Sequence, residues 1–187
     1  MATRAIVERA TGPFGAAVAT FDPSRRYRYR LSRIWAADDP VVAFVMLNPS
    51  TADAHRLDPT VRRCVGFARS WGFGGIEVVN LFAYRATDPA ELLRCPEPVG
   101  AGNDRAVLAA ALRADLVVAA WGAGGGHGDR GATVTARLAA RGVALCAIGR
   151  TKTGQPRHPL YVRGDVRPVP WSGPTPERGG IITAPSR

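Results

Sequence analysis

The stretch VVAFVMLNPSTAD, Val41 to Asp53, decides the fold class of this 187-residue chain. Its first seven residues are apolar, and a polar turn, 48–51, follows them directly. A short run that is apolar on both faces is typical of a strand buried inside a parallel sheet, because a half-exposed strand alternates apolar and polar residues. The turn therefore marks the carboxyl end of a strand, which is where open parallel sheets bind ligands.

Segments with helical spacing separate this run from three further apolar runs. Asp58 is expected to cap the first helix, with Pro59 in its first turn. Asn103 is expected to cap the second helix, and the third is expected within 132–141. The predicted buried helix residues are Val61, Cys64, Val65, Ala68 and Trp71 in the first helix, Val107, Leu108, Ala111 and Leu112 in the second, and Val134 and Leu138 in the third.

This alternation of apolar strands and helices predicts an α/β fold. We expect a three-layer α/β/α sandwich around a central, mainly parallel four-stranded sheet, with right-handed crossovers. The four strands are predicted in the runs 41–47, 75–84, 114–122 and 142–149. We expect a single domain over 1–171, with its core at 41–161, and a mobile Pro- and Gly-rich tail at 172–187.

Composition limits the class of protein and of partner. The longest apolar runs fall short of the roughly 18–20 residues of a membrane helix, and the N-terminus lacks the apolar block of a secretory signal, so we expect a soluble, cytoplasmic protein. The three cysteines are never paired as CxxC, and His55 and His127 have no spaced partners, so we expect neither a metal nor a cofactor. The oligomeric state is left open.

The charge is strongly basic, at +10, and favours a polyanionic partner. Every basic residue except Lys152 is an arginine, however, a bias that a GC-rich genome also produces. The run SRRYRYRLSR, 24–33, alternates Arg and Tyr, which predicts an edge or hairpin strand. Its arginines are either a solvated face or a strip that faces phosphates.

Polar residues follow each predicted strand at its carboxyl end. The loop GAGGGHGDRG, 122–131, matches neither the P-loop nor the dinucleotide fingerprint, so we interpret it as a flexible connection. The candidate ligand-binding residues are Asn48, Pro49, Ser50 and Thr51 after the first strand, Asn80 on the second, Trp121 and Gly122 after the third, and Lys152, Arg157, His158 and Tyr161 after the fourth.

Four of the polar side chains are candidates for catalysis or base recognition. The Asn48 carbonyl can hold a water but is no strong base, and Asp53 is the nearby carboxylate that we assign to catalysis beside it. Asn80 offers one donor and one acceptor in a plane, which matches the edge of a base, or else it ties two loops together. His158 can donate to an anion that develops during reaction.

The order of these strand ends resembles the uracil-DNA glycosylase superfamily. In that superfamily the first core strand ends in a carboxylate or amide followed by proline, which positions a water, and Asn48-Pro49 matches this pair. The asparagine that reads the base edge corresponds to Asn80, and the histidine that stabilises the departing base to His158. The resemblance covers about 41–161. It supplies no obvious match to the intercalating loop or to the aromatic residue that stacks on a flipped base.

The blocks MLNPSTAD, DPTVRRC, WGFGG, VVNLFAYRATDP, AAWG and TKTGQPRHPLY also resemble the signature blocks of a bacterial family, domain of unknown function 1643. Together, the two resemblances imply a protein that acts on nucleic acid as an N-glycosylase-like hydrolase of a modified or deaminated base. Two alternatives stay open. One is a nucleotide or nucleic-acid binder without catalysis that uses the same cleft, and the other is a hydrolase of free nucleotides.

Overall fold

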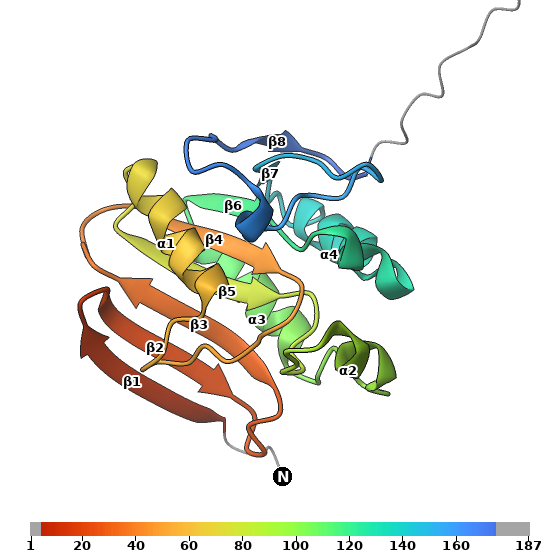
Figure 1. Cartoon of the computed structure of the whole chain (residues 1–187), viewed down its shortest axis with the longest axis horizontal. Helices are drawn as coiled ribbons and strands as arrows, with labels where there is room; N and C mark the ends of the chain where they lie inside the picture. The colour runs from red at the N-terminus through yellow and green to blue at the C-terminus, as the bar shows by residue number, and fades with distance from the viewer. Residues whose placement is uncertain (1–4, 175–187) are drawn as a thin grey trace, which may run out of the picture.

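The computed structural model describes residues 5–174 and contains one eight-stranded mixed sheet (Figure 1). Across the sheet the strands are ordered β1-β2-β3-β5-β4-β6-β7-β8. The α/β class predicted from the sequence is confirmed. The strands are β1 (Ile6–Gly12), β2 (Gly15–Phe21), β3 (Arg28–Ile34), β4 (Val41–Met46), β5 (Gly75–Asn80), β6 (Leu116–Ala119), β7 (Leu145–Ala147) and β8 (Val169–Trp171).

The prediction of four strands is wrong because both sides of the sheet carry antiparallel additions. Strands β5, β4, β6 and β7 are parallel and stand where the four apolar runs placed them. The meander β1-β2-β3 is antiparallel and continues the sheet beyond β5, and β8 is antiparallel to β7. The meander is rich in small and polar residues, which gave the N-terminal segment weak apolar patterning, and β8 is only three residues long.

Helices cover both faces of the central strands. Side chains of β4 alternate between two apolar clusters: Phe44 packs in the cluster that contains α1 (Pro59–Ser70), and Val45 packs in the cluster that contains α3 (Asn103–Arg113) and α4 (Arg130–Ala139). We call these the α1 face and the α3/α4 face (Figure 1). The described elements also include a short helix, α2 (Pro89–Arg94), and two 3-10 turns, η1 (Ala123–Asp129) and η2 (Pro159–Tyr161).

The start of α1 is as predicted, whereas the start of α3 is not. The Asp58 carboxylate accepts a hydrogen bond of 2.7 Å from the backbone amide of Val61, and Pro59 occupies the first turn. Asn103 is the first residue of α3 and makes no cap hydrogen bond, because its side chain donates instead to the backbone carbonyl of Asn80 at the end of β5. Leu112 was predicted to be buried but is 52% exposed, because it lies on the side of α3 opposite the core. The fully buried residues of α3 are Asn103, Val107, Ala110 and Ala111, and Leu108 packs against the same cluster while partly buried.

Strand β3 is an internal strand and not an edge. It is hydrogen-bonded to β2 on one side and to β5 on the other, so the hairpin part of the prediction holds and the edge part fails. A register shift opposite Phe21 places Arg28 on the buried side, where it is 2% exposed. Two of the arginines in 24–33, Arg28 and Arg33, are therefore interior residues and neither solvated nor a phosphate-facing strip.

Within residues 5–174, no helix has the length and apolarity needed to cross a membrane. The predicted mobile tail, 172–187, lies outside the described residues except for its first three positions.

Candidate functional site

The carboxyl ends of the parallel strands bring together the segments that the sequence singled out. Beyond β4 and β5 the pairing continues, because the amides of Leu81 and Phe82 donate to the carbonyls of Met46 and Leu47. Beyond β6, the amide of Gly122 donates to the Pro156 carbonyl at 2.8 Å, which ties this strand end to the loop that carries His158. The four predicted segments therefore line one edge of the sheet, here called the strand-end site.

Asn48 is fixed by its amide nitrogen and keeps its carbonyl oxygen available. Its Nδ2 donates to the carbonyl of Ala86 at 2.7 Å and to that of Pro49 at 3.1 Å. The Oδ1 atom accepts no hydrogen bond from residues 5–174. An oriented amide oxygen of this kind can hold a water or a ligand donor, but it cannot remove a proton as a carboxylate does.

The residues next to Asn48 shape the loop. Pro49 is buried, Thr51 is exposed, and the Ser50 hydroxyl lies 3.4 Å from that of Thr87. Asp53 accepts from the backbone amides of His55 and Arg56, both at 2.8 Å, which forms an Asx turn. One oxygen of this predicted catalytic carboxylate is thus already occupied by the loop's own backbone.

Asn80 is the least satisfied side chain of the strand-end site. It is 1% exposed, and neither its Nδ2 nor its Oδ1 has a partner among the described residues. Alternation along β5 points it to the α1 face, because Val79 packs on the α3/α4 face. An amide left in this state costs about 1–3 kcal/mol, which a ligand or a bound water would recover.

A different asparagine performs the loop-tying role that was the alternative for Asn80. The Nδ2 of Asn103 donates to the backbone carbonyls of Asn80 and Leu81, both at 2.9 Å. Its side chain thereby holds the end of β5 against α3. Because Asn103 meets this structural need, the Asn80 side chain is free for another use.

Arg28 lies on the same face as Asn80 and was missed as a site residue. Its Nη1 donates to the carbonyl of Ala52 at 2.7 Å, whereas its buried Nε has no partner among the described residues. Burial lowers the pKa of Arg28 to about 10; the negative charge of Asp58 counteracts this and the positive charge of Arg85 adds to it. Nothing in the sequence distinguishes Arg28 from the other arginines, since only the register shift in the meander turns it inward.

His158 stands beside the start of α1. Its Nδ1 accepts from the Leu160 amide at 3.4 Å, so the proton of the neutral ring lies on Nε2, where it can be donated. Burial lowers the pKa of His158, and the carboxylate of Asp58 partly opposes that shift. Asp58 is therefore a helix cap, as predicted, and also a charge that acts on both His158 and Arg28.

The other predicted binding residues do not gather around one point of the strand-end site. Trp121 is 1% exposed, donates from Nε1 to the side-chain oxygen of Gln155 at 2.8 Å and packs edge-on against Trp171. Gly122 contacts His158, since a Cβ there would meet the His158 Cβ at 3.4 Å. Lys152, Arg157 and Tyr161 are exposed, and the Tyr161 ring lies 5.8 Å from that of His158.

Within the described part of the chain, His, Cys, Asp and Glu side chains nowhere gather in threes that could hold a metal ion. The cysteines there are free thiols, with Cys64 buried and Cys95 and Cys146 partly exposed.

Comparison with known proteins gives one match. The profile of a family described as "Protein of unknown function (DUF1643)" matches residues 28–160, which include β3, the strand-end site except Tyr161, and the helices of both faces. No curated protein and no solved structure has a significant match to the chain.

Proposed function

The chain belongs to the DUF1643 family, and from the chemistry of its strand-end site we propose that it binds a nucleobase and hydrolyses the N-glycosidic bond of a modified or deaminated base. One observation carries the proposal. Asn80 presents a donor and an acceptor in one plane, both buried and both without a protein partner. The edge of a pyrimidine or purine offers the complementary pair.

The surrounding groups suit the charge changes of such a reaction. A base leaves the sugar as an anion, and the Nε2 proton of His158 and the positive charge of Arg28 stabilise negative charge. The Oδ1 of Asn48, held by the bond from its Nδ2 to Ala86, orients the attacking water. The oxygen of this water bonds to the sugar as the bond to the base breaks, and one of its protons neutralises the departing base anion. This division of roles agrees with the resemblance to uracil-DNA glycosylases, which motivates the proposal together with Asn80.

A second candidate, binding of a nucleotide or nucleic acid without catalysis, is favoured by the occupied carboxylates. One oxygen of Asp53 accepts two backbone amides, and Asp58 accepts the Val61 amide. Asn48 carries an amide, which cannot act as a general base in place of these carboxylates. Hydrolysis is accordingly expected to be slow, and the strand-end site would serve binding alone if no turnover occurs.

The test measures release of free base by chromatography. The full chain is incubated with single-stranded oligonucleotides and with nucleosides that contain uracil, hypoxanthine or other modified bases. We expect release of base from at least one oligonucleotide. The rate of release is expected to fall strongly in Asn48→Ala and Asn80→Leu. It is expected to be unchanged in Thr133→Ala, a substitution on the exposed surface of α4. Wild type and Asn48→Ala that are equally inert on every substrate would remove the glycosylase proposal.

Binding assays on the same variants separate the alternatives. Binding that survives Asn48→Ala, is lost in His158→Ala or Lys152→Ala, and never leads to turnover favours the non-catalytic binder. Release of base from monomers that is indifferent to competitor DNA favours a hydrolase of free nucleotides.

A further inference from the structure

A row of neighbouring hollows follows one side of α1. It consists of three hollows of about 650, 380 and 650 Å³. The first two share Leu57 and Arg62, and the second and third share Gly12 and Pro13 at the tip of the β1-β2 hairpin. From α1 the groove takes residues of one helical face, Pro59, Arg62, Arg63, Gly66 and Arg69. We call it the α1 groove.

The charge of the α1 groove is strongly positive. Its lining side chains include four arginines and, among carboxylates, only Asp39. Arg33 and Arg63 are bound to backbone carbonyls. The exposed side chain of Arg62 has no hydrogen bond or ion pair with residues 5–174. Because its charge is left unpaired at the junction of two hollows, it is available to a phosphate.

Aromatic rings lie at the hairpin end of the groove. The guanidinium of Arg69 is 5.1 Å from the ring centroid of Trp35 and 5.6 Å from that of Phe14. Both rings are half-buried, and Phe73 lines the same end. Arg62 and Arg69 form no ion pair within residues 5–174. Free arginines beside aromatic rings are the combination that binds single-stranded nucleic acids, by phosphate contact and by stacking.

The other end of the groove reaches the strand-end site. Pro59 lines the first hollow and directly follows Asp58, whose charge acts on His158. Arg63 joins the two regions, because it lines this hollow and donates to the carbonyls of Pro159 and Val162 in the loop after His158. The loop that carries His158 therefore lies beside the first hollow of the α1 groove.

We propose that the α1 groove binds the sugar-phosphate backbone of a single-stranded nucleic acid and delivers one of its bases to the strand-end site. This inference rests on the proposed function and names its substrate as a polymer, not a free nucleotide. A single strand fits because its bases are already unpaired, so that stacking and entry into a buried site require no opening of a duplex.

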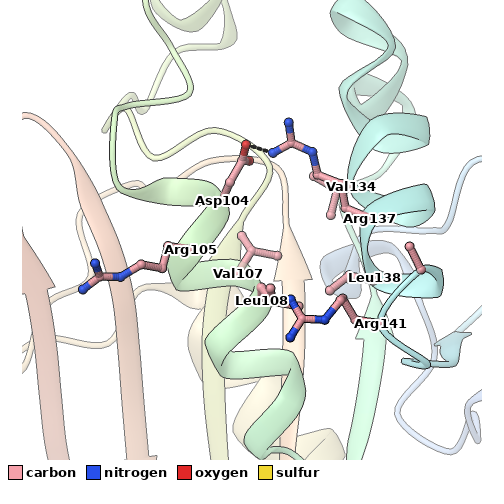
Figure 2. Close-up of a pocket in the computed structure, with 9 residues that line it drawn as sticks. Asp104, Arg105, Val107, Leu108, Val134, Arg137, Leu138 and Arg141 are labelled. Atoms are coloured by element: carbon pink, nitrogen blue, oxygen red, sulfur yellow. Dashed lines mark hydrogen bonds and ion pairs between the residues drawn. The ribbon is translucent and has the colours of Figure 1, made fainter.

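The test measures the affinity of labelled dT12 and rU12 by fluorescence anisotropy at several salt concentrations. Arg62→Gln/Arg69→Gln removes two charges from the α1 groove. The matched control, Arg105→Gln/Arg141→Gln, removes two exposed charges that border a separate hollow between α3 and α4 (Figure 2). We expect the first pair to weaken binding at least about tenfold and to reduce the salt slope by about 1.4, and the control pair to change affinity less than about twofold.

Melting temperatures verify that both double variants are folded, and Arg62→Gln alone is expected to give about half of the change in salt slope. The two oligonucleotides decide between DNA and RNA. Equal weakening of binding by both double variants would show diffuse charge attraction and overturn the proposal that the α1 groove binds a single strand. The proposal would also be overturned if inorganic polyphosphate competed for the protein as well as dT12 does. Neither result affects release or binding of a free base through Asn80, which tests the proposed function separately.

Discussion

On the α3/α4 face, the carboxylate of Glu77 is buried and accepts from the guanidinium groups of Arg30 and Arg113. On the α1 face, Arg28 is equally buried and has no carboxylate within ion-pair distance among the described residues, and the Asn80 amide is unpaired as well. The same sheet thus pairs a buried charge with two counter-charges on one side, where the Oδ1 of Asn103 is unpaired among the described residues, and leaves both a buried charge and a whole side-chain amide without such partners on the other.

Helices α3 and α4 extend the satisfied network. Arg130 of α4 donates to the Leu81 carbonyl and pairs with Asp104, which also pairs with Arg137. Because the fold pairs the carboxylates of Glu77 and Asp104 with arginines on one face, it is also able to pair charged groups on the other face. The unsatisfied groups on the α1 face are therefore better explained by a ligand than by poor packing, because buried polar groups are otherwise nearly always paired.

The largest expected effect is on the satisfied face. Glu77→Gln leaves Arg30 without its counter-charge in a partly buried position. We expect the free energy of unfolding, measured in urea, to fall by about 2–3 kcal/mol, at the lower end for buried pairs because both arginines are partly exposed. A loss below about 0.5 kcal/mol would contradict the structural role of this network.

The two buried asparagines give the sharpest contrast between the faces. Asn103→Leu removes two hydrogen bonds to the end of β5, and we expect it to cost about 1–3 kcal/mol in the free energy of unfolding. Asn80→Leu removes no bond, so we expect a change below about 1 kcal/mol or a gain in stability, together with loss of ligand binding. Urea unfolding of both variants measures the difference. Equal destabilisation would mean that Asn80 is structural.

A pH effect is expected from His158. Burial lowers its pKa in the folded protein below the ordinary value of 6.5, so the unfolded chain binds more protons between these two pKa values. This residue's contribution to stability is complete above about pH 7.5 and is lost as the pH falls through 6.5 toward the folded pKa. The free energy of unfolding, measured from pH 8 to pH 5.5, is expected to depend less on pH in His158→Gln than in the wild type. If the two proteins gave parallel curves of this free energy against pH, the burial of the His158 ring would be disproved.

The smallest effect on stability is expected at Asp58. Asn is as good a helix cap as Asp, so Asp58→Asn is expected to alter the free energy of unfolding by only a few tenths of a kcal/mol. The carboxylate that raises the pKa of His158 is removed, however, so an NMR titration of the ring is expected to show a lower pKa in the variant. An unchanged titration would separate Asp58 from the strand-end site.

Sequence patterning predicted the centre of the sheet better than its sides. The run 41–47 and its three counterparts are apolar on both faces, and such runs have few alternatives to buried parallel strands. The meander carries Ala, Thr and Arg, so its place in the sheet is decided by pairing with β5 and not by local periodicity. Pairing between distant segments leaves no short-range signal, which also explains the misplaced Asn103.

The strand-end site was only partly predictable for the same reason. Asn48, Asn80 and His158 follow or end apolar runs, so their place at one edge of the sheet follows from topology. Arg28 reaches the site only through the register shift in the meander, and the charge of Asp58 reaches His158 only because η2 packs on α1. Conversely, Trp121 follows strand β6 as expected, but its ring packs against Trp171 in the core.

The side-chain amide resonances of Asn80 give the most direct test of base recognition. The ¹⁵N-labelled full chain is titrated with free uracil, hypoxanthine and other bases while the side-chain NH₂ signals of Asn80 are recorded. These signals are assigned by their loss in Asn80→Leu. The NH₂ signals of Asn103 serve as the internal control. The proposed function predicts a saturable shift of the Asn80 signals with at least one base while those of Asn103 change much less. Signals of Asn80 that stay fixed with every base would contradict it.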